Sequence, residues 1–128
     1  MNSFLFRLYL TNAIFLILHE VDAAYWQEWR LFGLPGGVDG FLLFHVPLLF
    51  IILRGLIEVS RGSSVGSLVS FFLSGCGLVA VVIHVFFLAK GGTEFSTPIS
   101  LAILAGIGIT SLIQASAAAS AGRTGRER

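Results

Sequence analysis

The chain has 128 residues, of which 55% are hydrophobic and only 12% are charged. An ordinary soluble domain has about 25% charged residues, so this composition excludes that class and indicates a protein whose solvent is the lipid bilayer. The formal net charge of +1, without a basic patch interleaved with aromatics, gives no sign of a nucleic-acid partner. A single cysteine, Cys76, excludes a disulfide framework and a paired-cysteine metal motif.

Four apolar blocks are each long enough to cross a membrane. They cover residues 4–24, 38–57, 66–89 and 98–118, close to the ~20 residues that a helix needs to span a hydrocarbon core. Helices are expected because lipid offers no hydrogen-bonding partner to an open backbone. We therefore predict an all-α, polytopic membrane protein. A single four-helix transmembrane domain covers residues 1–120, and a basic cytoplasmic tail covers residues 121–128.

The first block also has features of a secretory signal peptide, because Arg7 precedes a short apolar run that ends in two alanines. The residues that follow, Tyr25, Trp26 and Trp29, are of the kind that gather at the membrane–water interface. We therefore favour a retained transmembrane helix that ends in an interfacial aromatic belt. As an alternative, the same aromatics form a lid over a pocket on that side.

Charge asymmetry predicts the orientation of the chain. With four spans, both termini lie on one side of the membrane, and that side has six arginines against two acids. The arginines are Arg7, Arg54, Arg61, Arg123, Arg126 and Arg128. The opposite side has most of the acidic residues. The positive-inside rule then places both termini in the cytoplasm.

The fourth block differs from the others in its small residues. Ala102, Gly106 and Thr110 recur at every fourth position, a spacing that lets helix backbones approach closely. This face is suited to packing in the bundle or to docking against another membrane subunit.

The three histidines are predicted to lie at one depth. His19 lies about five residues before the outer end of the first span, His45 about seven residues after the second span begins there, and His84 about five residues before the third span ends. At 1.5 Å per residue, each is roughly 8–10 Å below the outer boundary. Ionisable residues inside spans usually face the bundle interior and mark a functional site.

Imidazoles at this depth suit several chemistries. They ligate transition metals or haem iron, and they transfer protons near neutral pH. Asp22 shares the helix face of His19, so the candidate ligands are His19, His45, His84 and Asp22. Acids at the same level that are suited to orient them are Glu20, Glu28 and Asp39. The plainer interpretation is that each histidine only hydrogen-bonds a neighbouring helix.

Residues 19–37 carry the pattern H-E-x-D-x-x-Y-W-x-E-W followed by a Pro-Gly-Gly turn. This stretch resembles the N-terminal signature of a family of small bacterial four-helix membrane proteins of unknown function. It is also loosely similar to the membrane proteins with an H-x-x-E-E motif, although here Ala23 stands in place of the second acid. The resemblance implies a four-helix protein integral to the bacterial inner membrane. It also implies five motif positions, namely His19, Glu20, Asp22, Trp26 and Glu28. It implies no particular activity.

Two functional hypotheses follow from the sequence. In the first, the histidines and acids form a site in the outer half of the bundle that binds a transition metal, a haem-like tetrapyrrole or a small lipophilic ligand. In the second, the chain is an accessory or assembly subunit of a larger membrane complex. The sequence leaves open whether the protein is an enzyme, and it specifies no cofactor.

Overall fold

The computed structural model describes residues 3–124, and the regular structure in that range is entirely α-helical. The long helices are α1 (Ser3–Tyr25), α3 (Gly37–Arg61), α4 (Ser64–Ala89) and α5 (Pro98–Thr124), and α2 (Glu28–Leu31) is a single turn. All four long helices are long and apolar enough to cross a membrane, which confirms the predicted all-α fold with four transmembrane helices. Of the predicted tail, α5 includes residues 121–124, and residues 125–128 lie outside the described range.

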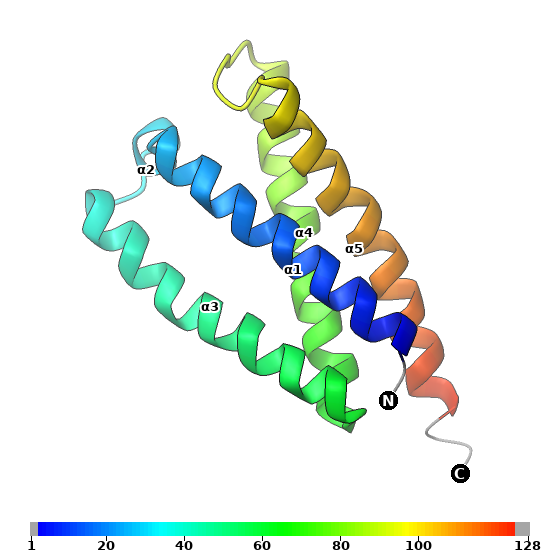
Figure 1. Ribbon diagram of the computed structural model, residues 1–128. Coiled ribbons are helices and arrows are strands. Elements are labelled where there is room, and N and C mark those ends of the chain that lie inside the picture. The colour runs from blue at the N-terminus through cyan, green and yellow to red at the C-terminus, as the bar shows by residue number, and fades with distance from the viewer. Residues whose placement is uncertain (1–2, 125–128) are drawn as a thin grey trace.

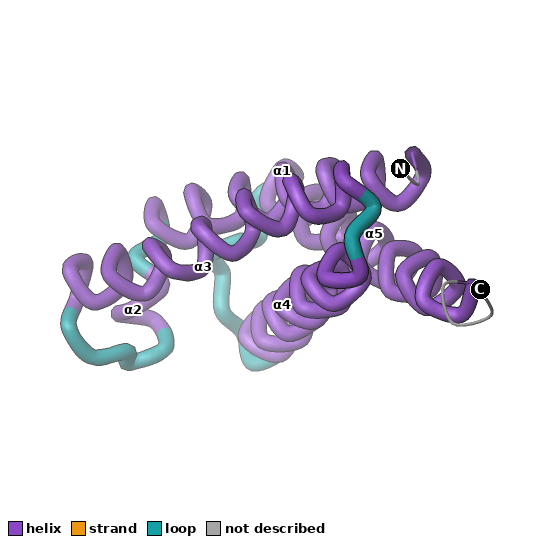
Figure 2. Tube along the Cα trace, turned by 90° about the horizontal axis from the view of Figure 1, so that it is seen from below, coloured by secondary structure: helices purple, strands orange, loops and turns teal. Residues whose placement is uncertain are grey.

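The helices form a splayed bundle in which α1 begins and α5 ends at the same end (Figure 1). The opposite end carries α2 and the connection between α4 and α5, and we call it the α2 end. Helix α5 lies along both α4 and α1, while α3 contacts α1 and α4. Helices α3 and α4 diverge from their connecting turn toward the α2 end (Figures 1 and 2).

A tight turn joins α3 to α4 and sets the point from which they diverge. Gly62 ends α3 with a left-handed φ of 66°, a conformation that glycine adopts without steric cost. Ser63 then caps α4, because its Oγ accepts a hydrogen bond from the Gly66 backbone N–H at 3.2 Å. The same hydroxyl donates to the carboxylate of Glu58 at 2.7 Å.

Small residues bring the helices into close contact. A Cβ atom added to Gly77 of α4 would lie 2.3 Å from Ser111 Oγ and 2.8 Å from Ile107 of α5. Likewise, the Tyr9 hydroxyl of α1 lies against Gly55 of α3 and donates to a backbone carbonyl of α3 at 2.9 Å. Glycine at these positions therefore determines how near α4 approaches α5 and how near α1 approaches α3.

The small-residue face of α5 is used partly inside this chain. Gly106 lies against the ring of Phe15 on α1, and the Thr110 hydroxyl donates to Asn12 at 3.0 Å. Ala102, by contrast, is exposed. The part of this face formed by Gly106 and Thr110 therefore packs on α1, and docking of another subunit on α5 stays a prediction.

Near the middle of the bundle a buried polar network joins α1, α4 and α5. The Asn12 amide donates to Gln114 at 2.8 Å and to Ser111 at 3.1 Å. The Gln114 amide in turn donates to the Ser70 carbonyl of α4 at 3.3 Å. Asn12 and Gln114 are completely buried. Polar contacts of this kind hold transmembrane helices together in the absence of a hydrophobic driving force.

Replacing Asn12 by alanine is expected to lower the free energy of unfolding by about 1–3 kcal/mol, because it leaves Gln114 and Ser111 partly unpaired. Thermal or denaturant unfolding of the purified protein in mild detergent measures this change. The matched control is Thr11→Ala, since Thr11 is exposed on the same helix. Equal stability of the two variants would contradict a structural role for the network.

Candidate metal centre

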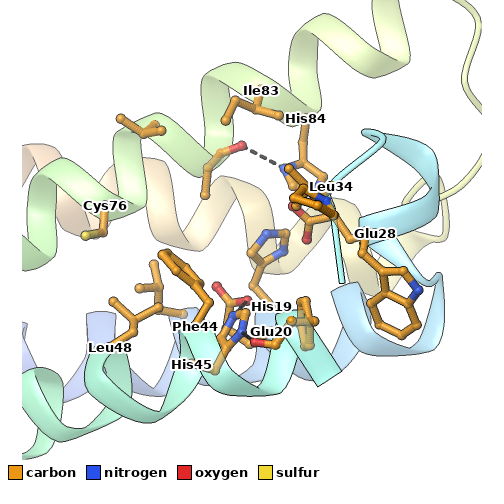
Figure 3. Close-up of a pocket in the computed structure, with 17 residues that line it drawn as sticks. His19, Glu20, Glu28, Leu34, Phe44, His45, Leu48, Cys76, Ile83 and His84 are labelled. Atoms are coloured by element: carbon orange, nitrogen blue, oxygen red, sulfur yellow. Dashed lines mark hydrogen bonds and ion pairs between the residues drawn. The ribbon is translucent and has the colours of Figure 1, made fainter. Parts of the chain in front are cut away.

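A cavity of about 460 Å³ lies between α1, α3 and α4 at the α2 end (Figure 3). All three histidines line it, His19 from α1, His45 from α3 and His84 from α4. Glu20 and Glu28 line it as well. Three histidines from three different helices therefore line one cavity.

Glu28 reaches the cavity because the chain folds back after α1. Gln27 adopts a left-handed conformation with φ 54°, and it precedes the single turn of α2. The Arg30 guanidinium donates to the Gln27 side chain at 2.9 Å, which supports this turn. The Leu34 N–H donates to the Trp29 carbonyl at 2.7 Å and closes the segment. Glu28, the first residue of α2, therefore faces the helices instead of the interface.

His19, Glu28 and His84 form the tightest cluster. One ring nitrogen of each histidine and a carboxylate oxygen of Glu28 lie within 4.8 Å of one another. The two imidazoles meet edge to face, with ring centroids 4.4 Å apart, and both are almost fully buried. Two imidazoles and one carboxylate form a donor set typical of zinc and non-haem iron sites.

Two buried ring nitrogens of this cluster have no hydrogen-bond partner among the described residues, Nδ1 of His19 and Nε2 of His84. His84 Nδ1 donates to the Ala80 carbonyl at 2.8 Å (Figure 3). In the neutral ring, this bond leaves Nε2 with a lone pair. A buried polar atom without a partner costs about 1–3 kcal/mol, and a bound cation would remove that cost.

Aromatic rings enclose the cluster. Phe95, from the connection before α5, lies with its ring centroid 4.4 Å from that of His84 and 6.1 Å from that of His19. Phe32, which follows α2, contacts the His84 ring from another direction at 5.6 Å. Phe95 is fully buried and has a positive φ of 62°, which is uncommon for a residue with a side chain. These rings shield the imidazoles from water.

His45 has a different partner from the other two histidines. Its Nδ1 donates to the Phe41 carbonyl at 2.6 Å, and its Nε2 lies 2.5 Å from a carboxylate oxygen of Glu20. Because Nδ1 holds a proton, Nε2 and Glu20 share one more, either as imidazolium and carboxylate or as imidazole and carboxylic acid. The pair lines the same cavity as His19, Glu28 and His84.

The other predicted residues lie at the edge of this arrangement or beyond it. Asp22 and Asp39 are not among the residues that line the cavity. Tyr25 is 75% exposed, as in the predicted aromatic belt, whereas Trp29 lines the cavity and contacts Phe41 with ring centroids 5.2 Å apart. The cluster with Glu28 differs from the predicted ligand set of His19, His45, His84 and Asp22, which stays a prediction.

Comparison with known proteins places the chain in a family. A model described as a family of unknown function (DUF6713) matches residues 5–121. The chain belongs to this family. The predicted resemblance to a family of unknown function is thereby confirmed, and the match includes residues of all four long helices. No curated protein and no solved structure matches the chain.

In this DUF6713 member, little in the sequence indicates that Phe95 is buried against the histidines. The residue stands alone in a connection otherwise rich in glycine, serine and threonine, and a lone large aromatic in such a segment is a weak signal for a buried position. The sequence predicts Glu28 only as an acid that orients the ligands. The chain folds back at Gln27, where no glycine or proline indicates a turn, so the sequence does not show that Glu28 reaches the histidines.

The pKa of Glu28 bears on metal binding in this DUF6713 chain. The pKa of Glu28 is raised from 4.5 to about 7, chiefly by burial and also by the nearby carboxylate of Glu20, while His45 opposes the rise. Below that pH the carboxyl group holds a proton, which a cation must displace. Affinity for a divalent metal is therefore expected to fall as the pH drops below 7, by about tenfold per unit well below the pKa.

Isothermal titration of Zn²⁺ from about pH 5.5 to about pH 8, in several buffers, measures both the affinity and the proton release. Glu28→Gln is the control, because it removes the titrating carboxyl group and should bind more weakly with a shallower pH profile. The same steep profile in that variant would contradict the assignment to Glu28.

Proposed function

We propose that this protein binds a divalent transition-metal ion inside the membrane, at a site formed by His19, Glu28 and His84. The observation that carries the proposal is the cluster of three potential ligand atoms within 4.8 Å of one another. In support, a buried nitrogen of each histidine has no partner, and the Ala80 carbonyl orients His84 as in many metal sites.

The distances require only a small adjustment. Each metal–ligand bond in a zinc site is about 2 Å long, so two ligands of one ion lie about 3–4 Å apart. Side-chain shifts of about 1 Å bring the three groups from their present separation into that range. Three protein ligands also leave at least one coordination position open, the pattern of sites that bind an exogenous molecule.

Of the ligands that the sequence leaves open, the geometry favours a metal ion over a tetrapyrrole. The rings of His19 and His84 contact each other directly, and Phe95 contacts both. A macrocycle held between two axial histidines needs a gap between the rings, and this packing provides none. A single ion needs no such gap.

Elemental analysis of the protein purified in mild detergent, followed by titration with Co²⁺, tests the proposal. We expect about one zinc, iron or manganese per chain as isolated, or a cobalt absorption spectrum typical of nitrogen and oxygen ligands. A protein that contains no metal and gives no such spectrum would overturn it. Co-purification of other membrane proteins with that metal-free chain would then favour the accessory-subunit hypothesis.

We place the site toward the outer face of the bacterial inner membrane. Arginines predominate on the side where α1 begins and α5 ends, so the positive-inside rule supports cytoplasmic termini. The α2 end, with the metal site, would then face the periplasm. The ion would be bound from that side or from within the bilayer.

Single cysteines test this orientation in a Cys76→Ala background. We expect a membrane-impermeant maleimide to label Thr93→Cys in intact spheroplasts, because Thr93 is exposed at the α2 end. Ser64→Cys, exposed at the other end, should be labelled only after permeabilisation. The reverse pattern would show that the termini are outside.

A further inference from the structure

The cavity beside the proposed metal site is polar at one end and apolar at the other. His19, Glu20 and Glu28 line it near the α2 end. About one helical turn deeper in the membrane, Leu16 of α1 and Leu48 of α3 replace them. Since each helix turn rises 5.4 Å, the lining changes from charged to fully apolar within the length of a small molecule.

The cavity is open toward lipid. Among the residues that line it, Phe44 of α3 is 66% exposed, and Val79 and Ile83 of α4 are 58% and 43% exposed. All three lie within membrane-spanning helices, so the surface they expose faces acyl chains. They lie on the two helices that diverge toward the α2 end (Figure 1). The bilayer therefore has direct access to the cavity.

The Glu20–His45 pair, which shares a proton, lies at the polar end of the cavity. Glu20 uses one carboxylate oxygen for His45 and retains a second one. Both side chains line the cavity and are partly exposed, 12% for His45 and 21% for Glu20. A carboxylate with an imidazole suits hydrogen bonding to a hydroxyl or carbonyl oxygen, by accepting or donating the shared proton.

We propose that this cavity binds a neutral lipophilic alcohol or carbonyl compound that enters from the bilayer between α3 and α4. Its oxygen lies among Glu20, His45 and Glu28, and its apolar chain lies along Leu16, Leu48 and Val79. The volume of about 460 Å³ falls within the roughly 300–1,000 Å³ of typical small-molecule sites.

The charge of the cavity selects a neutral head group. Two carboxylates, Glu20 and Glu28, face the polar end, and the described lining residues include no lysine or arginine. Without a bound cation, an anionic head such as a phosphate or a fatty-acid carboxylate would find no lysine or arginine to pair with, and it would meet like charge wherever Glu20 or Glu28 is ionised. The preference for a neutral head group therefore applies to the metal-free cavity, and the cavity and its opening do not depend on the proposed metal function.

Photolabelling in reconstituted vesicles tests the proposal. The probe is a long-chain alcohol with a diazirine on its chain, and the matching fatty acid is the comparison. We expect the alcohol to label Phe44, Leu48 and Ile83 preferentially, and excess unlabelled alcohol to abolish this labelling. In Val79→Trp, which fills the opening, labelling should fall about tenfold. Val82→Trp is the control, because Val82 is exposed on the same helix but does not line the cavity.

Uniform labelling of lipid-facing residues would overturn the proposal, as would an equal effect of the two tryptophan variants. Should Val79→Trp fail to accumulate, competition by unlabelled alcohol in the unmodified protein decides the question. Metal content, measured on the same samples, separates this inference from the proposed function. Preferential labelling of a metal-free protein would support the ligand cavity and contradict the metal site. Uniform labelling of a protein that contains metal would support the metal site and contradict the ligand cavity.

Discussion

Replacing His84 by alanine is expected to lower the affinity for the metal by about 100-fold or more, since the loss of even an orienting partner costs 10–100-fold. One ring nitrogen of His84 lies within 4.8 Å of ligand atoms of His19 and Glu28, and its Nδ1 is held by the Ala80 carbonyl. Nothing else among the described residues of the cluster replaces that nitrogen. Metal content after purification and the cobalt spectrum measure the loss.

His45→Ala is the matched control, because His45 lines the same cavity but is paired with Glu20. This variant should retain the metal. Glu28→Gln is a second test in case the His84 variant does not fold. Glu28 lies outside the long helices, so its glutamine variant should fold while it binds metal weakly. Equal metal loss in the His45 and His84 variants would instead favour a site that includes all three histidines.

Gly77→Val is expected to destabilise the bundle by about 3 kcal/mol or more, at the upper end of the usual cost of overpacking. The added side chain would collide with Ser111 and Ile107 of α5, and both of these residues are fully buried. The helices α4 and α5 would have to separate, which also strains the Asn12 network. Thermal unfolding and size-exclusion chromatography in detergent measure the effect.

Gly75→Val provides the comparison on the same helix. A Cβ atom at Gly75 meets nothing within 4 Å, and valine costs little in a lipid-facing helix position. We expect near-normal stability for this variant. If both valine variants were equally destabilised, the cause would be the loss of glycine flexibility in α4 and not the contact with α5.

The sequence predicts the depth of the site but not the rotation of the helices. Because successive spans run in opposite directions, the positions of His19, His45 and His84 in their spans are enough to place them at one level. Apolar residues surround every span, so no hydrophobic stripe shows which face looks inward. The rotation of each helix about its axis brings His19 against His84 and turns His45 toward Glu20. This rotation depends on packing between distant parts of the chain, such as the contact of Tyr9 with Gly55.

Glu28 shows a second limit of the sequence. Its position after an aromatic pair indicates an interfacial segment, in which an acid normally faces water. The side chain of Glu28 points into the bundle because Gln27 adopts a left-handed backbone conformation, for which glutamine has no strong preference. The four helices follow from hydropathy alone, whereas this local turn follows from tertiary packing.

The order of the helices along the chain has a consequence for how the protein is made. Helix α1 enters the bilayer with a histidine and a glutamate side by side, His19 and Glu20, and neither has its partner until later helices follow. Helix α3 supplies His45 to Glu20 first, and only α4 brings His84 to His19. Loading of the proposed ion must therefore wait until the third long helix has been inserted, which makes metal acquisition a late step of biogenesis.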